Sequence, residues 1–391
     1  MAKLLISCDN TLRRVGDKYY FKAPEWRDLY YRYLRVFDNI KIIVRCVDSS
    51  SISSQYILID NPCIDIVYIP EFSGPIAYAR KYQIIGNCIK SSILDCDAAV
   101  FRLPSTIAQR VAHFWRYTGK PYAVEVVFDA MDGWKSEFNI INKILWMKMD
   151  LDMRRTCYRA DGVSCVTESY LQKRYYSRKS NCFVSHYSTL DLPKSFYLSE
   201  RKYPESRTIV LANVANQVQY NGRKGFYEII LALALLKSRG IIIHAKFVGK
   251  DYHKGVSKFK KLINKLGITD QVEFLGYLSR SELDHFLSTV DMFVMPTRAE
   301  GLPRVVIEAM AKGLPVITTP VSGNPELVEE HFLVEYNDIN KLADRIQELA
   351  SDKELYESTS RNNYLKSKNY ESSILQNRRD EFYRNLLEIT K

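Results

Sequence analysis

Short apolar runs and amphipathic stretches alternate along the second half of the chain. The runs predict strands, and the stretches, in which apolar residues recur every three or four positions, predict helices. Expected strands cover residues 208–212, 241–248, 271–275, 291–296 and 316–319, and expected helices cover 226–238, 256–266, 281–289 and 303–312. This alternation predicts a parallel sheet with right-handed helical crossovers, which is an α/β fold.

The clearest unit of this pattern runs from Met295 to Glu326. An apolar strand ends at Pro296, a polar loop follows, and a helix is expected from Pro303, whose missing N–H suits a first helical turn. Gly313 fits the position just after that helix. Ligands of open α/β sheets bind just beyond the carboxyl ends of such strands, so the polar loop is a candidate binding site.

Two glutamates with seven residues between them occupy this unit, Glu300 in the loop and Glu308 in the helix. The spacing, with E-G-L-P before the helix, E-A-M-A-x-G-x-P-V-I within and after it, and N-P-E-L-V beyond, resembles the E-x7-E signature of retaining GT-B glycosyltransferases. The resemblance is closest to the GT4 family. It implies that Glu300 addresses donor-sugar hydroxyls, that Glu308 binds the ribose, and that the backbone at Gly301, Leu302 and Pro303 approaches the diphosphate. Carboxylates suit this role because they accept hydroxyl hydrogen bonds. Two solvent-facing glutamates are the alternative.

The loop after the first strand of this half extends the resemblance. Lys224 and Gly225 match the K-G pair that the family places before a helix. The arginine expected earlier in the loop is missing, and Asn213 and Val214 stand in its place. Arg223 is the candidate substitute, and we expect Lys224 and Arg223 to stabilise negative charge on the leaving diphosphate. A solvated basic loop is the alternative.

Three further donor-binding candidates follow strands of the second half. Gly249 resembles the family's glycine turn at a strand end. Tyr277 and Leu278 match its next strand end, where the resemblance implies that their backbone lines the nucleobase.

The first half is expected to be an α/β domain too, with strands at residues 3–8, 40–47, 63–69, 98–102, 121–128 and 162–167. The loop expected at 9–18 holds one glycine, Gly16, where many GT4 members carry paired glycines against donor and acceptor. After the strand at 121–128 the family commonly places a histidine or an acidic group facing the acceptor, so Asp129 and Asp132 are candidates. Arg102, at another strand end, suits either an anionic ligand or a structural ion pair.

The resemblance therefore implies the GT-B fold, two Rossmann-like domains with parallel sheets facing across a cleft. Residues 1–195 would form the acceptor-side domain and residues 196–370 the nucleotide-sugar donor domain. The helix expected within 371–391 would cross back to the first domain.

Composition fits such a protein, because 391 residues with 46% hydrophobic and 26% charged residues suffice for two cores. We expect no membrane-spanning segment and no signal peptide. The eight cysteines are scattered without C-x-x-C pairs, which suits buried thiols in a reducing compartment and predicts a cytoplasmic protein. Two D-x-D triplets, at 95–97 and 150–152, resemble the metal motif of another glycosyltransferase class, but chance explains them better and we expect no metal site.

Net charge is +11 with a pI near 9.1. No nucleic-acid motif accompanies it, so we expect no nucleic-acid partner. Residues 19–37 and 143–159 mix basic and aromatic side chains. Such segments suit either a core helix with a wet charged face, favoured for 19–37, or peripheral contact with the inner face of the cell membrane.

The expected reaction moves a sugar from a nucleotide diphosphate sugar, of UDP or GDP type, to a hydroxyl of a glycan or lipid-linked acceptor. Retention at the anomeric carbon, no metal and no other cofactor are what the resemblance implies, and the family's usual role suggests bacterial surface polysaccharide or glycolipid assembly. Two alternatives stay open: a nucleotide-sugar epimerase of GT-B fold, and a catalytically inactive GT-B subunit that binds a partner enzyme.

Overall fold

The computed structural model describes residues 2–22, 24–53, 56–135, 137, 139–205, 208–220 and 222–390. The chain divides into two compact units, Met1–Thr189 with Gln376–Lys391, and Leu190–Leu375. The first boundary lies at residue 189 rather than at the expected 195, because Leu190 and Leu192 are buried and Leu192 forms a β-bridge with Glu371 of the second unit. The final helix, α13 (Ser372–Glu388), begins in the second unit and continues in the first.

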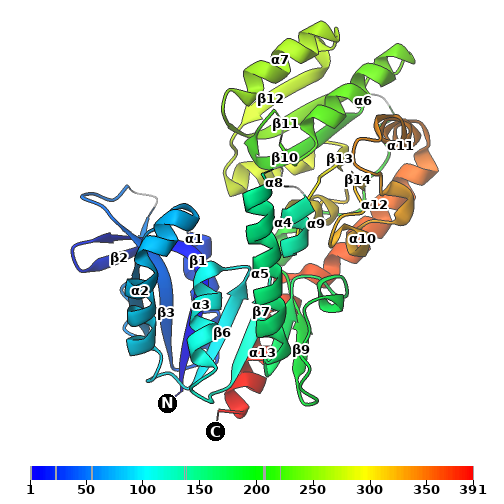
Figure 1. Ribbon diagram of the computed structural model, residues 1–391. Coiled ribbons are helices and arrows are strands. Elements are labelled where there is room, and N and C mark those ends of the chain that lie inside the picture. Colours follow the sequence, from blue (N-terminus) through cyan, green and yellow to red (C-terminus); the bar gives the residue numbers. More distant parts are fainter. Residues whose placement is uncertain are drawn as a thin grey trace. The chain divides into compact units, whose positions relative to one another are not determined.

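The first unit is built on one large sheet. Its parallel strands are β1 (Lys3–Val15), β3 (Asn39–Asp48), β5 (Ile64–Pro70), β6 (Ala98–Leu103), β7 (Tyr122–Val126), β8 (Gly162–Cys165) and β9 (Phe183–His186). They lie in the order β5–β3–β1–β6–β7–β8–β9 (Figure 1). The sheet is extended by β2 (Lys18–Phe21), antiparallel to β1, and β4 (Ile57–Leu58), antiparallel to β2.

Helices cover this sheet on both sides. They are α1 (Pro24–Tyr31), α2 (Gly74–Ser92), α3 (Thr106–Trp115), α4 (Ala130–Lys135) and α5 (Ile140–Tyr158). Helices α2, α3 and α5 lie side by side along one face (Figure 1), and α13 packs on the sheet through Phe382 against Phe183. Tyr30, Tyr33 and Phe37 are buried, as the core interpretation of residues 19–37 expects.

The first strand is longer than expected. We predicted a strand at 3–8 and a loop at 9–18, and this is wrong: β1 continues to Val15 and forms a hairpin with β2. The prediction rested on a short apolar run, but the register against β3 shifts between Ser7 and Thr11, and the strand continues through this bulge beyond the run. Leu12, beyond the bulge, is buried, and Gly16 occupies the hairpin turn with φ 58°.

The second unit has a five-stranded sheet that is parallel throughout, as predicted. Its strands are β10 (Val210–Val218), β11 (His244–Asp251), β12 (Val272–Gly276), β13 (Met292–Met295) and β14 (Val316–Thr318), in the order β12–β11–β10–β13–β14. Strand β10 passes through a register shift after Val214 and runs beyond the expected 208–212. Asn213 and Val214 therefore belong to a strand and not to the loop in which we expected them.

The helices of this unit are α6 (Phe226–Ser238), α7 (Gly255–Lys265), α8 (Arg280–Thr289), α9 (Arg304–Ala311), α10 (Asn324–Leu327), α11 (Ile339–Ser351) and α12 (Lys353–Ser367). Pro303 is the N-cap of α9 and precedes its first turn. Gly313 has φ 71°, and the N–H groups of Gly313 and Leu314 donate to the carbonyls of Met310 and Ala309 at 2.8 and 3.1 Å. This Schellman arrangement confirms the predicted end of the helix.

The strand order places β10 beside β13 at the centre of the second sheet. In chain order the sheet reads third, second, first, fourth, fifth, so the direction of winding reverses between these two strands. The loops that leave their carboxyl ends diverge there, and open α/β sheets bind ligands at such a point.

Candidate active site

Lys224 and Glu300 meet at this switch point. Lys224 lies in the loop between β10 and α6, Glu300 in the loop between β13 and α9, and Lys224 Nζ forms an ion pair with Glu300 Oε1. The Thr297 hydroxyl oxygen lies 3.2 Å from the same carboxylate oxygen. The side chain of Glu300 is 11% exposed and that of Lys224 34%, so both can be reached from solvent. The structure thus brings together the two residues that the sequence makes the centre of the candidate site.

Hydrogen bonds fasten the two loops to each other. The carbonyl of Arg223 accepts from the Thr297 hydroxyl and from the Arg298 N–H, each at 2.9 Å. Buried Asn213 donates from Nδ2 to the carbonyls of Lys224 at 3.0 Å and Val294 at 2.7 Å. Asn213, which stands where the family's arginine was expected, therefore holds the Lys224 loop in place.

A close backbone approach also fixes the Lys224 loop. Gly225 has φ 77°, and a Cβ at this position would meet Cγ and O of Pro296 at 2.5 Å. Any larger residue would push apart the loops that carry Lys224 and Glu300, which explains the glycine of the K-G pair.

A third loop, which follows β14, supports the Glu300 loop. The Gly323 N–H donates to the Gly301 carbonyl at 3.0 Å, and the Thr319 hydroxyl donates to the Thr297 carbonyl at 2.6 Å. Asn324 donates to the Thr319 carbonyl at 2.9 Å. Sequence reasoning missed Thr297, Thr319 and Asn324, although Asn324 begins the N-P-E-L-V segment that drew attention to this region.

Glu308 projects from α9 and is largely buried. Burial raises the pKa of its carboxyl, while the charges of Arg280 and Arg304 oppose that rise. Arg280 Nη1 lies 3.6 Å from Glu308 Oε1. Arg280 is the first residue of α8, and Ser279 separates it from Tyr277 and Leu278. Glu308 therefore contacts the first residue of the helix that follows the segment expected to line the nucleobase.

The other donor-side candidates differ in exposure. Tyr277 follows β12, is 63% exposed, and carries Lys250 Nζ 4.7 Å from its ring centroid. Leu278 is partly buried. A Cβ at Gly249 would meet the Ala215 carbonyl oxygen at 2.7 Å, so this glycine allows the end of β11 to approach β10. Leu302 and Pro303 are buried and Gly301 is partly buried.

In the first unit Asp129 is buried and fully engaged. One of its oxygens, Oδ1, accepts from the Tyr175 hydroxyl at 2.8 Å and from the Met131 N–H at 2.9 Å. The Tyr175 hydroxyl oxygen also lies 2.9 Å from Oδ1 of Asp150, which accepts two hydrogen bonds from Arg174. These contacts hold the Asp129 carboxylate in the β7–α4 turn. The Gly16 turn lies in the same unit, and a Cβ there would meet no atom within 4 Å.

Asp132 lies in α4, six residues after the end of β7, and has a different environment. It is buried, Lys135 Nζ lies 3.3 Å from its Oδ1, and its Oδ2 accepts no hydrogen bond from the described residues. Burial, reinforced by the charge of Asp129, raises the pKa of Asp132 to about 6. The Asp132 carboxyl can therefore accept a proton at a pH about two units above the ordinary range of an aspartate.

Other charged candidates are engaged in ion pairs. Arg102 lies 2.5 Å from Glu125, which is the structural alternative that the sequence left open. In the two D-x-D triplets, Asp95 pairs with Lys41 at 2.6 Å and Asp150 with Arg174 at 2.5 Å.

Comparison with known proteins agrees with this geometry. Residues 210–366 match the family model of glycosyl transferases group 1. Protein CapJ of Staphylococcus aureus is 25% identical over 347 residues, which span 87% of this chain and 84% of CapJ. The capsular polysaccharide biosynthesis glycosyltransferase CapM of S. aureus is 28% identical over 203 residues, 50% of this chain and 52% of CapM. The putative colanic acid biosynthesis glycosyltransferase WcaL of Escherichia coli K12 is 33% identical over 133 residues, 32% of each chain.

Solved structures share the fold. Sucrose-phosphate synthase of Thermosynechococcus elongatus matches over the whole of both chains with a TM-score of 0.70 and 16% identity. HepE of Anabaena, solved in complex with UDP, matches 96% of this chain and 98% of its own with a TM-score of 0.66 and 16% identity. The predicted GT-B fold, with two Rossmann-like units on parallel sheets, is thereby confirmed.

Among the described residues, no helix has both the length and the apolar character needed to cross a bilayer.

The raised pKa of Asp132 predicts a pH dependence of stability. Between the ordinary value near 4 and about 6, the folded protein binds more protons than the unfolded chain, so stability falls as pH rises through this window. In thermal unfolding, the stability of Asp132→Asn relative to the wild type should therefore increase between pH 4.5 and 7 and stay constant above about pH 7. Asp17→Asn, at an exposed position of the β1–β2 turn, is the control. A difference between wild type and Asp132→Asn that does not vary with pH would contradict the assignment.

Proposed function

We propose that this protein is a retaining glycosyltransferase of the GT4 type. It would transfer a hexosyl group from a nucleotide diphosphate sugar to an acceptor hydroxyl, with the donor on the Leu190–Leu375 unit and the acceptor on the other. The observation that carries the proposal is the pairing of Lys224 with Glu300 at the switch point of the second sheet. The group 1 family match over residues 210–366 supports it independently.

Lys224 would provide most of the charge stabilisation. As the bond to the sugar breaks, negative charge grows on the leaving diphosphate, and a fixed cation stabilises that transition state more than the ground state. Without donor, Lys224 is held by Glu300; a diphosphate would compete for its ammonium group and free the carboxylate to accept hydroxyl hydrogen bonds from the sugar. Arg223, the residue before it, would add a second cation.

Glu308 would accept hydrogen bonds from the ribose hydroxyls. Its burial favours this role, because a carboxylate removed from water gains more from two charge-assisted hydrogen bonds than an exposed one. The adjacent segment with Tyr277 and Leu278 would line the base, and the largely exposed ring of Tyr277 offers a stacking surface. HepE, which shares the fold, was solved in complex with UDP, and we propose a UDP- or GDP-linked donor here.

The acceptor side is assigned to Asp132 rather than to Asp129. Asp132 has a carboxylate oxygen that accepts no hydrogen bond from the described residues and a pKa near neutrality. It would orient or deprotonate the acceptor hydroxyl. The relatives CapM and WcaL bear names from capsular polysaccharide and colanic acid biosynthesis, and we propose a surface polysaccharide or glycolipid acceptor.

The transfer reaction can be tested with Lys224→Met and Glu300→Gln. Removing one preorganised charge-stabilising group typically lowers kcat by about a hundredfold to a thousandfold, and we expect this loss for Lys224→Met. Product analysis by NMR should show an α-linked product from an α-linked donor, and activity should persist with EDTA. The control is Lys258→Met, at an exposed position of α7.

Other outcomes would each contradict one part of this proposal. An isomerised donor without transfer would establish the epimerase alternative, and an inverted product would remove the retaining assignment. Full activity in Lys224→Met would show that this lysine does not stabilise the leaving group.

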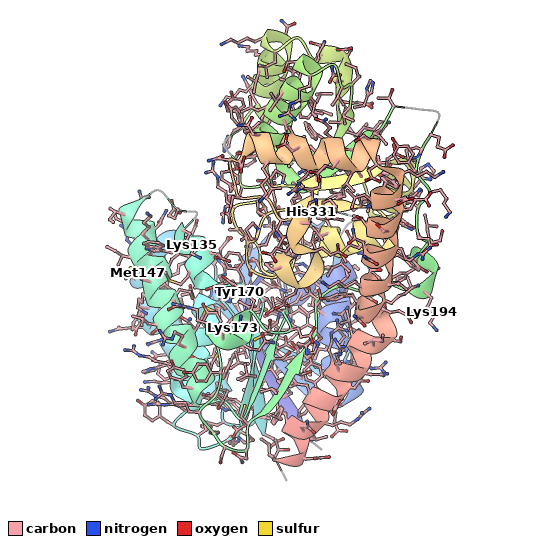
Figure 2. The ribbon with its side chains drawn as sticks, turned by 90° about the vertical axis from the view of Figure 1, so that its right-hand side faces the viewer. Lys135, Met147, Tyr170, Lys173, Lys194 and His331 are labelled. Carbon is pink, nitrogen blue, oxygen red and sulfur yellow. The ribbon has the colours of Figure 1, made fainter. Side chains whose placement is uncertain are left out.

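We further propose peripheral contact of α5 with the cytoplasmic face of a membrane. Four aliphatic residues at helical spacing, Ile140, Ile144, Met147 and Leu151, are 48% to 68% exposed. Met147, labelled in Figure 2, lies on the outward side of the helix. The side chains of Lys148 and Arg155, more than 70% exposed, border the stripe. An apolar stripe bordered by cations suits an interface with anionic lipid.

Vesicle co-sedimentation tests this contact. The wild type should bind vesicles that contain phosphatidylglycerol more strongly than vesicles of phosphatidylcholine alone, and Ile144→Gln with Leu151→Gln should abolish most of the difference. The matched control replaces Ile76 and Leu94, aliphatic side chains of the same unit that are 71% and 69% exposed. Equal losses in both double variants would refute a role specific to α5.

A further inference from the structure

Helix α8 places a cation beside the buried carboxylate of Glu308. Arg280 is the first residue of α8, and its Nη1 lies 3.6 Å from Oε1 of Glu308. This separation is longer than a hydrogen bond, so the contact is an ion pair that leaves the lone pairs of the carboxylate unoccupied. Among the described residues, no group donates a hydrogen bond to this carboxylate. Glu308 therefore has acceptor capacity that the protein itself does not use.

The guanidinium of Arg280 is held from its other side. Its Nη2 donates to the carbonyl of Asp191 at 2.7 Å. The side chain is 45% exposed, and it lines an open recess of about 420 Å³ together with Pro193 and Phe196. A shorter side chain at position 280 would enlarge this open space instead of leaving a cavity in the core, so Arg280 can be replaced without loss of packing.

Arg280 is the main charge that opposes protonation of Glu308. Burial raises the pKa of Glu308, the charges of Arg280 and then of Arg304 lower it, and that of Asp284 raises it. Arg304 is exposed, so water screens its charge. Asp284 forms an ion pair with Lys312, which reduces its repulsion of Glu308.

The other elements packed on α9 direct their charges elsewhere. Strands β13 and β14 carry no ionisable side chain. In α12, Lys353, Glu357 and Arg361 form ion pairs with residues of the 200–205 segment. Arg280 is therefore the nearest cation to Glu308 among the residues that the structure describes.

The charge state of Glu308 decides what it can bind. An ionised carboxylate accepts hydrogen bonds at both oxygens, whereas a protonated one carries an O–H donor on one of them. Hydrogen bonds from two ribose hydroxyls are also stronger when the acceptor is charged. We propose that Arg280 is a positioning residue that keeps Glu308 ionised for the ribose of a nucleoside diphosphate. This inference rests on the proposed transferase function, and Arg280 takes no part in the transfer step.

The ionisation of Glu308 can be followed without nucleotide, by ¹³C NMR of the full-length protein labelled at its glutamate carboxyl groups. The Glu308 resonance is the one that Glu308→Gln lacks. A nearby opposite charge lowers the pKa of a carboxyl by about one to three units, and Arg280 is half exposed, so Arg280→Gln should raise the pKa of Glu308 by about one unit. Arg280→Lys keeps the positive charge and should restore most of the difference. The control, Arg361→Gln, removes the arginine of the ion pair with Glu200 and should leave the Glu308 titration unchanged.

The affinity for UDP and GDP, measured by calorimetry across a range of pH, gives a second readout. If binding needs the ionised carboxylate, affinity falls about tenfold for each pH unit below the pKa of Glu308. The affinity of Arg280→Gln should therefore begin to fall at a pH about one unit higher than that of the wild type, and the two proteins should converge at high pH. Titration of the diphosphate itself is common to both proteins and cancels in their ratio. In a Glu308→Gln background, Arg280→Gln should add no pH-dependent loss.

Three results would overturn the proposal: an unchanged Glu308 titration in Arg280→Gln, a loss of affinity that is equal at every pH, or equal effects of Arg280→Gln and Arg361→Gln. A loss equal at every pH is what a direct contact between Arg280 and the nucleotide would cause. If the titration shifts as described but no nucleoside diphosphate binds the wild type, the effect of Arg280 on Glu308 stands and the transferase function fails. If a nucleoside diphosphate binds but the titration does not shift, the transferase function stands and this inference fails.

Discussion

The ion pair between Lys224 and Glu300 joins two loops that come from different crossovers of the second sheet. It contributes little to stability, because a partly exposed pair of this kind is worth only about 0–1 kcal/mol. Its importance lies in position: the pair holds a cation and a carboxylate together at the point where the sheet reverses its winding. The buried hydrogen bonds of Asn213, Thr297 and Thr319 give that position its rigidity.

In the second unit, buried strands support the loops that carry the candidate site. Strands β13 and β14 and residues 211–214 of β10 are buried, and the loops that follow these strands are tied to one another through backbone carbonyls. Side chains that face solvent, such as Lys224 and Tyr277, are thereby free to meet a ligand without moving the backbone. In the first unit the buried carboxylate of Glu125 is held by four partners, Arg102 and the hydroxyls of Tyr33, Tyr187 and Tyr383, and this arrangement fixes Arg102.

Much of the second unit could be predicted from its sequence. Helix α6 and the Gly313 ending of α9 follow directly from apolar spacing and glycine placement. The extensions of β1 and β10 were not predicted, since each strand continues through a register shift beyond its apolar run into a more polar segment. Asn213 shows what a motif alone does not reveal. The sequence shows that the expected arginine is missing, but the role of Asn213 in its place depends on hydrogen bonds to carbonyls that lie 11 and 81 residues away.

The first unit was less predictable because its important contacts are long-range. Glu125 looks like any residue of an apolar strand, yet its partners include Tyr383, 258 residues along the chain. Asp132 and Asp129 could not be ranked without knowing that Tyr175 engages one and that burial perturbs the other.

The central claim, that the second unit binds a nucleoside diphosphate through α9, is tested most directly by thermal unfolding with UDP, GDP, ADP and CMP. A ligand at about a hundredfold excess over Kd adds roughly 2.7 kcal/mol of stability. We predict that UDP or GDP stabilises the wild type and that Glu308→Gln loses most of this shift, while the exposed-surface variant Glu354→Gln keeps it. No stabilisation by any of the four nucleotides, or an equal shift in both variants, would contradict the account.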